Sequence, residues 1–159
     1  MFPDARPEGA QAVAASTALV VLDTNVVLDW VAFDDPRVRA IVAAIEGGTL
    51  RPVTSAACLE ELRRALGYPE VKLDAGAQAL AFARYCARAT LVDMPPDDDA
   101  VNLPLCEDPD DQKFLELAWH AHAGCLVTRD KALLKLARRI AQLGRFRVLA
   151  PPEFDAWRC

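Results

Sequence analysis

The sequence predicts an α/β fold built around a mainly parallel sheet, and three observations support that class. Short apolar runs alternate along the chain with longer stretches of helical periodicity, as in successive βαβ units. The first run, Ala18–Leu22, is continuously apolar, which is typical of a strand covered by helices on both faces. The length of 159 residues, with 53% hydrophobic residues, suits one globular domain with a substantial core.

The expected elements are short, and glycine or proline marks several of their ends. Gly47 and Gly48 end the second helix, Gly67 ends the third, and Pro109 suits the first position of the fifth. The pattern predicts strands over residues 18–22, 50–53, 91–92, 125–128 and 146–149. It predicts helices over residues 24–33, 36–46, 55–66, 73–89, 109–122 and 131–143.

We expect one domain over residues 18–150, between a flexible leader and a short tail. Residues 1–17 are rich in alanine, with proline and glycine, and residues 151–159 follow the last strand with a Pro-Pro pair. Inside the domain, the Pro- and Asp-rich stretch over 93–108 is predicted to be a loop, with a brief extended piece at 101–103.

Composition argues against several classes of protein. No apolar run approaches the roughly 20 residues of a membrane-spanning helix, and the N-terminal segment lacks the basic start of a signal peptide. Five scattered cysteines without a C-x-x-C pair, and two histidines, favour neither a zinc site nor a disulfide framework. We therefore expect a cytoplasmic protein without membrane contact, with Cys58, Cys86 and Cys125 in its core.

The charge is unevenly distributed. A formal net charge of −5 argues against a general polyanion binder, yet residues 129–147 are strongly basic while 93–99 and 107–111 are acidic. An acidic pocket beside a basic face suits a metal-dependent nuclease. A solvated basic helix on an acidic protein explains the same charge equally well.

Four acidic residues stand where an apolar segment meets a loop or a helix: Asp23, Glu61, Asp111 and Asp130. Asp23 directly follows the first strand and Asp130 lies two residues beyond the fourth, so both belong at the carboxyl edge of a parallel sheet, where ligands bind. Carboxylates gathered there repel one another unless a cation holds them. The sequence therefore predicts a Mg²⁺ or Mn²⁺ site, with helix capping an equal alternative for Asp130.

Helical spacing separates Glu61 from its neighbour Glu60. Glu61 shares a stripe with Cys58, Leu62 and Ala65, and a glutamate on a buried stripe needs a partner, which a metal ion would supply. Glu60 lies off that stripe and is assigned to the surface.

The same argument selects Asp111 near the start of the fifth helix. Asp111 aligns with Leu115, Ala118 and His122 on the buried stripe, which makes His122 a partly buried core residue. Asp108 is a natural N-cap for this helix, and an alternative in which it supplies or shares the third acidic role stays open.

Four segments together resemble the PIN domain family, and more closely its branch of toxin components of toxin–antitoxin systems (VapC-like). They are 20-VVLDTNVVL-28, 55-SAACLEELRRAL-66, 108-DPDDQKFLELA-118 and 126-LVTRDKALL-134, and the resemblance spans about residues 19–148. It implies a three-layer α/β/α sandwich, with acids clustered at one edge to hold Mg²⁺ or Mn²⁺, and endoribonuclease activity. By motif, the family's four acids fall on Asp23, Glu61, Asp111 and Asp130.

Two polar residues are matched by the same motifs. Asn25 falls on the family's polar position after the first acid, and Thr128 on the Thr or Ser before the fourth. Thr128 is expected either to donate to a substrate phosphate or to cap the following helix, and both alternatives stay open.

The implied mechanism is hydrolysis of an RNA phosphodiester without a covalent intermediate. Asp23, Asp111 and Asp130 would position one or two ions, and Glu61 would bind a second ion or orient the attacking water. Backbone contacts to single-stranded RNA would come from some of the basic side chains Lys131, Lys135, Arg138, Arg139, Arg145 and Arg147.

The resemblance also implies association, as a homodimer and, for a toxin, with an antitoxin from an adjacent gene. The candidate interface anchors are four aromatic residues on predicted helices, of which at least half are expected in the core: Trp30, Phe33, Phe82 and Tyr85.

Two other functions are weighed against a nuclease. A haloacid-dehalogenase-like phosphatase would need a second aspartate two residues after Asp23, where the chain has Asn25. A non-catalytic RNA-binding PIN module would not need all four acids.

Overall fold

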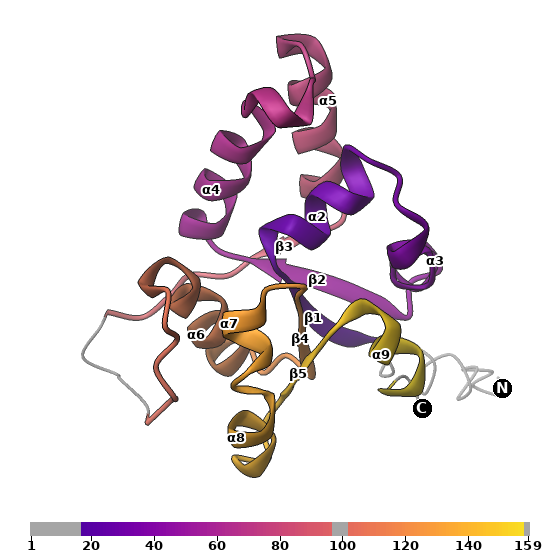
Figure 1. The fold of residues 1–159 in the computed structure, drawn as a ribbon. Coiled ribbons are helices and arrows are strands. Elements are labelled where there is room, and N and C mark those ends of the chain that lie inside the picture. The colour runs from indigo at the N-terminus through magenta and orange to yellow at the C-terminus, as the bar shows by residue number, and fades with distance from the viewer. Residues whose placement is uncertain (1–16, 97–101, 158–159) are drawn as a thin grey trace, which may run out of the picture.

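The computed structural model describes residues 17–96 and 102–157, which form a parallel sheet with helices on both faces (Figure 1). The strands are β1 (Ala18–Leu22), β2 (Leu50–Thr54), β3 (Thr90–Leu91), β4 (Cys125–Val127) and β5 (Arg147–Leu149). The sheet has five strands in the order β3-β2-β1-β4-β5, and all its pairings are parallel. The predicted α/β class and three-layer arrangement are confirmed.

The helices lie in two layers, one on each side of the sheet (Figure 1). One layer holds α2 (Thr24–Val31), α3 (Arg39–Glu46), α4 (Ala56–Leu66), α5 (Ala75–Cys86) and α9 (Pro151–Trp157). The other holds α6 (Gln112–His120), α7 (Lys131–Leu134) and α8 (Ala137–Gln142). Short 3₁₀ turns at Pro36–Val38, Pro69–Val71 and Pro109–Asp111 precede or join them.

Alternate residues of β1 divide the core between the layers. Val20 and Leu22 pack in the cluster that includes α2 to α5 and α9, whereas Val21 packs in the cluster of α6 to α8. This is the two-sided burial that a continuously apolar strand requires, because successive side chains point to opposite faces. The central position of β1 brings its carboxyl end, and Asp23 after it, to the middle of one edge of the sheet.

The prediction of a single helix over 131–143 is wrong in one respect, because this segment forms two helices. The chain turns between α7 and α8, where the Leu136 N–H donates to the Leu133 carbonyl at 3.0 Å. Leu133, Leu136 and Ile140 are all buried, and the turn allows these side chains to reach the core together.

Residues 151–157, expected as part of a tail, instead form α9. The Pro-Pro pair opens this helix, because proline suits the first helical turn. The Glu153 Oε1 accepts from the Ala150 N–H at 3.0 Å, which satisfies a donor at the helix start. Phe154 is fully buried and contacts the Trp157 ring, with ring centroids 5.8 Å apart, so α9 is part of the core.

Several smaller expectations are settled, and others fall outside the described residues. His122 is exposed, not partly buried, because α6 ends at His120 and His122 adopts a left-handed φ of 55°. β3 begins one residue earlier than expected. Residues 1–16, which make up nearly all of the expected leader, and Val101 of the expected extended piece lie outside the described residues, and Asn102 and Leu103 form no strand. Among the residues described, no helix is long and apolar enough to span a membrane.

Candidate active site

Asp23 and Asp130 lie at the carboxyl edge of the sheet, as predicted. β1 and β4 are parallel neighbours with Leu22 opposite Val127, so the residues after these strands are brought side by side. The Asp23 N–H donates to the Val127 carbonyl at 3.0 Å, which extends the pairing to the aspartate itself. Asp23 is 3% exposed, and Asp130 is partly buried.

Thr128 connects these two acids through its hydroxyl. The Thr128 Oγ1 donates to Asp23 Oδ2 at 2.6 Å and accepts from the Asp130 N–H at 2.9 Å. Thr128 is fully buried, so its one hydroxyl proton is used inside the protein. This geometry favours neither of the two alternatives for Thr128, phosphate binding or simple capping. Instead, the Thr128 hydroxyl orients Asp23 and fixes the backbone at Asp130.

Asp130 combines both roles that the sequence left open for it. Its Oδ1 accepts from the Ala132 N–H at 2.8 Å and so caps α7. Its carboxylate also lies close enough to Asp23 and Asp111 to raise the pKa of both. Asp23 occupies the N-cap position of α2 but makes no capping bond with its side chain.

Asp111 is the acid with the least compensation for its burial. It is 8% exposed, and its Oδ2 is buried without a hydrogen-bond partner among the described residues. Burial, then a hydrogen bond with Asp130 and the negative charges of Asp23, Asp130 and Asp108, together raise the pKa of Asp111 to about 7. Asp108 is exposed and caps the 3₁₀ turn through the Asp110 N–H at 2.9 Å, so the geometry favours Asp111 for the third acidic position.

The surroundings of Asp23 also disfavour its ionised form. Burial raises the pKa of Asp23 above its ordinary value; the hydrogen bond from Thr128 lowers it, and the charges of Glu61 and Asp130 raise it again. All four predicted acids therefore lie within electrostatic reach of at least one other. The charges of Asp23 and Asp130 act on Asp111, and the charges of Glu61 and Asp130 act on Asp23.

Glu61 differs from the other three because both of its oxygens have partners. The Glu61 Oε2 accepts from the Thr24 hydroxyl, and Oε1 lies 2.6 Å from the Lys113 Nζ. Glu61 lies on the inner side of α4, as its spacing predicted, while Glu60 is exposed. Asn25 is exposed in the first turn of α2, next to this group.

The oxygen atoms of these acids are the type of ligand that a hard divalent cation prefers, but the acids are not yet spaced to enclose one. Carboxylate oxygens are the ligands that Mg²⁺ and Mn²⁺ prefer, and the unpartnered Asp111 Oδ2 together with the raised pKa values marks a place where positive charge is missing. As the side chains stand, no three acidic, Cys or His side chains of the described residues come close enough to enclose an ion. Binding would therefore require these carboxylates to move closer together.

Two features of the site were not predicted. Lys113 lies in the first turn of α6, beside the acids, and an unfavourable charge near a helix N-terminus is the signal that could have indicated a partner for it. Asp29 is 2% exposed and forms a two-point ion pair with Arg129, with Nε–Oδ2 at 2.7 Å and Nη2–Oδ1 at 3.1 Å. An aspartate inside the apolar run of α2 needs such a cation.

The described surface also has a hollow of about 390 Å³ that is separate from the acids. It is lined by Asn102, Leu103, Pro104, Arg139, Gln142 and Leu143. None of the four acids contributes to it, so we assign no functional role to this hollow.

Comparison with known families agrees with the geometry. A family model described as PIN domain matches residues 19–132, which is well over half of the chain and includes all four acids. The chain belongs to the PIN domain family. The matched region begins inside β1 and ends inside α7, so it contains both strands whose carboxyl ends carry Asp23 and Asp130.

A solved structure shares the fold of this PIN domain. It is a chain in the crystal structure of VapBC2 from Rickettsia felis bound to a DNA fragment from their promoter, with a TM-score of 0.57 and 12% sequence identity. The match covers 83% of this chain and 98% of that chain. No curated protein sequence matches the chain significantly.

Proposed function

We propose that this PIN domain is a Mg²⁺- or Mn²⁺-dependent endoribonuclease that hydrolyses phosphodiester bonds of RNA. The observation that supports this most strongly is the group of Asp23, Asp111 and Asp130, two of them buried, at the carboxyl edge of the sheet with no lysine or arginine paired to them among the described residues. Three carboxylates in mutual repulsion are costly to keep unless they serve a cation.

Asp23, Asp111 and Asp130 would hold the ion, with Glu61 as the fourth acid of the site. When bound, a divalent ion lowers the pKa of water and offsets charge that develops on the phosphate oxygens. Glu61 would contribute a ligand only by leaving Lys113 or Thr24, to which its two oxygens are bonded.

The remaining side chains prepare the acids for this role. The hydrogen bonds of the Thr128 hydroxyl to Asp23 and of Asp130 to the start of α7 limit how far these two carboxylates can rotate. Asn25 is exposed beside Asp23 and is proposed to contact the substrate.

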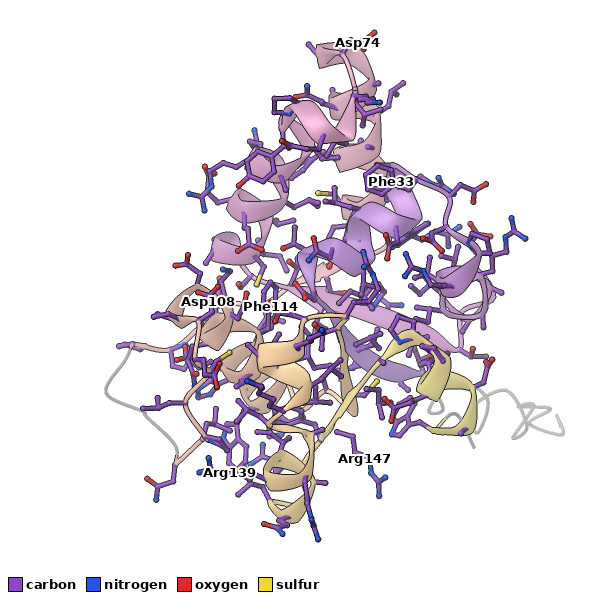
Figure 2. The ribbon with its side chains drawn as sticks, viewed as in Figure 1. Phe33, Asp74, Asp108, Phe114, Arg139 and Arg147 are labelled. Atoms are coloured by element: carbon purple, nitrogen blue, oxygen red, sulfur yellow. The ribbon has the colours of Figure 1, made fainter. Side chains whose placement is uncertain are left out.

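The placement of the basic residues narrows the proposed RNA contacts. Arg147 begins β5 and pairs with Cys125 at the start of β4, so it lies at the opposite edge of the sheet from the acids. Figure 2 shows Arg139 and Arg147 in the lower part of the view, below Asp108 and Phe114. Lys131, exposed directly after Asp130, is the basic residue of this segment best placed to reach a phosphate at the site.

We also propose that the protein is the toxin of a toxin–antitoxin pair, acting in the cytoplasm with an antitoxin from an adjacent gene. The structural neighbour named as VapBC2 supports such a partner, and the free thiols Cys58, Cys86, Cys106 and Cys125 fit a reducing compartment. An arginine or lysine of the antitoxin would compete with the metal for the carboxylates. Growth arrest on expression without the adjacent gene, lost with Asp23→Asn, is the expected behaviour of a toxin.

A homodimer remains part of this proposal, with fewer aromatic anchors than the sequence offered. Trp30 and Tyr85 are 3% exposed and pack edge-to-face in the core, with centroids 5.9 Å apart. Phe82 is partly buried under the Arg63 guanidinium. Phe33, which is 49% exposed, is the aromatic of the four that is available to a partner.

Cleavage of single-stranded RNA by the purified chain tests the function. We expect cleavage with Mg²⁺ or Mn²⁺, none in excess chelator, and a loss of at least about a hundredfold in Asp23→Asn, equivalent to about 2.7 kcal/mol in the barrier. Asp155→Asn, an exposed aspartate on α9, is the matched control and should cleave normally. Full activity in chelator, or in Asp23→Asn, would contradict the proposed site.

A further inference from the structure

Lys113 places a fixed ammonium group inside the acidic site. Its Nζ lies 2.6 Å from Glu61 Oε1, donates to the Asp110 carbonyl, and is 5.0 Å from the centroid of the Phe114 ring. The Lys113 and Glu61 side chains are only 22% and 21% exposed. Partners on α4, on the 3₁₀ turn and on α6 therefore hold the ammonium from three directions.

This ammonium divides the four acids into two kinds. Glu61 is neutralised by Lys113 and also accepts from Thr24, so it has no free oxygen. Among the described residues, no ion pair is formed by Asp23, Asp111 or Asp130, and the Asp111 Oδ2 has no partner at all. Asp111 is more than nine-tenths buried and lies in the field of Asp23 and Asp130. The site therefore lacks positive charge only around Asp23, Asp111 and Asp130, and not around Glu61.

A second divalent ion bound by Glu61 would have to take the place of the Lys113 Nζ. A Mg²⁺ ion lies about 2.1 Å from its carboxylate ligands, which is within the space that the ammonium now fills at 2.6 Å from Oε1. Two cations cannot share that position, because their repulsion adds to the overlap. Displacing Lys113 would also break its bonds to Glu61 and to the Asp110 carbonyl.

We propose that Lys113 takes the place of a second metal ion, so that the site binds one divalent cation between Asp23, Asp111 and Asp130. Glu61 is then a positioning residue, held by Lys113 and Thr24, and not a metal ligand. This inference rests on the proposed function, and it removes the role of second-ion ligand that the sequence left open for Glu61. The fixed ammonium supplies positive charge beside the ion without being able to dissociate.

The number of Mn²⁺ ions bound per chain tests this assignment, by calorimetric titration of the full chain without RNA. We expect one ion in the wild type, two in Lys113→Met and one in Lys113→Arg, because the methionine leaves the Glu61 oxygen without a cation and the arginine replaces the charge. Lys72→Met, at an exposed lysine after the second 3₁₀ turn, is the control and should bind one ion.

Each outcome separates this inference from the proposed function. Two ions in the wild type, with metal-dependent cleavage, would overturn the role of Lys113 and leave the nuclease intact. One ion in a folded Lys113→Met would also overturn it. If Lys113→Met does not fold, Lys113→Gln and the wild-type count decide in the same way. No Mn²⁺ bound by the wild type would contradict the proposed function itself.

Discussion

Two buried aspartates at the same end of the molecule have opposite surroundings. Asp29, in the last turn of α2, accepts from two nitrogens of the Arg129 guanidinium, so both of its oxygens have a partner, whereas Asp111 keeps one oxygen without a partner. Both carboxyls are more than nine-tenths buried, so burial alone does not explain the difference. The protein supplies its own cation where a carboxylate joins structural elements, and omits one where Asp23, Asp111 and Asp130 meet. The difference locates the place that an external cation would fill.

Glu61 stands between these two cases. Glu61 is as close to Lys113 as Asp29 is to Arg129. Its ion pair, however, lies beside Asp23, Asp111 and Asp130, which form no ion pair among the described residues. Arg129 and Asp130 are neighbours in sequence, so one short segment after β4 carries both a compensating cation and an uncompensated acid. Compensated and uncompensated groups can therefore be changed separately by mutation.

The largest expected effect comes from breaking the compensated pair. Arg129→Met leaves Asp29 buried without a counter-charge, and we expect a loss of about 3 kcal/mol in the free energy of unfolding, the lower end for a buried pair because Arg129 is a third exposed. Thermal and urea denaturation measure it. Arg88→Met, at an exposed arginine after α5, should leave stability unchanged.

A double variant sharpens this prediction. Asp29→Leu combined with Arg129→Met removes both charges, and it should recover most of the stability lost in the single variant. Recovery would show that the cost comes from the unpaired carboxylate. A double variant as unstable as Arg129→Met alone would mean that the packing of Arg129, and not its charge, is what matters.

A comparable effect is expected on catalysis when Glu61 is neutralised. Glu61→Gln leaves the Lys113 ammonium without its counter-charge, so we expect RNA cleavage to fall by about a hundredfold, or about 2.7 kcal/mol. Glu60→Gln, one residue earlier on the exposed side of α4, should cleave at the wild-type rate. An equal loss of RNA cleavage in Glu61→Gln and Glu60→Gln would contradict the assignment of Glu61 to the site and Glu60 to the surface.

A smaller effect is expected in the pH dependence of the metal-free protein. The Asp111 pKa is about 7 in the folded state and near its ordinary value of 3.8 when unfolded. The folded state therefore holds this proton more tightly, and stability falls as the pH rises from about 3.8 to about 7. Asp111→Asn cannot ionise, so its melting temperature relative to wild type should rise across that window.

The expected gain of Asp111→Asn at pH 8 is on the order of 1 kcal/mol, or roughly 2–4 °C, and it should vanish near pH 4. Asp110→Asn, an exposed neighbour whose carboxylate faces solvent, provides the control and should follow the wild type at every pH. A constant offset between Asp111→Asn and wild type would show that Asp111 does not titrate in this range.

The sequence predicted the parts of the site that follow from local pattern. Asp23 and Asp130 come directly after buried strands, and parallel pairing of β1 with β4 is sufficient to bring them together. Glu61 and Asp111 were selected by helical spacing, and both lie on the inner sides of their elements. All five strands were located to within a residue or so for the same reason, because short apolar runs have little freedom in an α/β chain.

The contacts that the sequence did not predict join residues far apart in the chain. Lys113 meets Glu61 across 52 positions, and Arg129 meets Asp29 across 100, so no local periodicity reports either pair. The break between α7 and α8 depends on how Leu133, Leu136 and Ile140 fit the core. The helix α9 was missed because a Pro-Pro pair is equally suited to ending an element and to opening one.

The melting temperature of the metal-free chain, measured with and without Mn²⁺, tests most directly whether the uncompensated acids bind a cation. At a Mn²⁺ concentration about a hundred times the dissociation constant, stability should rise by about 2.7 kcal/mol, which corresponds to roughly 5–10 °C for a chain of this size. Asp23→Asn should lose most of that rise, while Asp155→Asn should keep it. No rise in the wild type, or an equal rise in Asp23→Asn, would contradict the account.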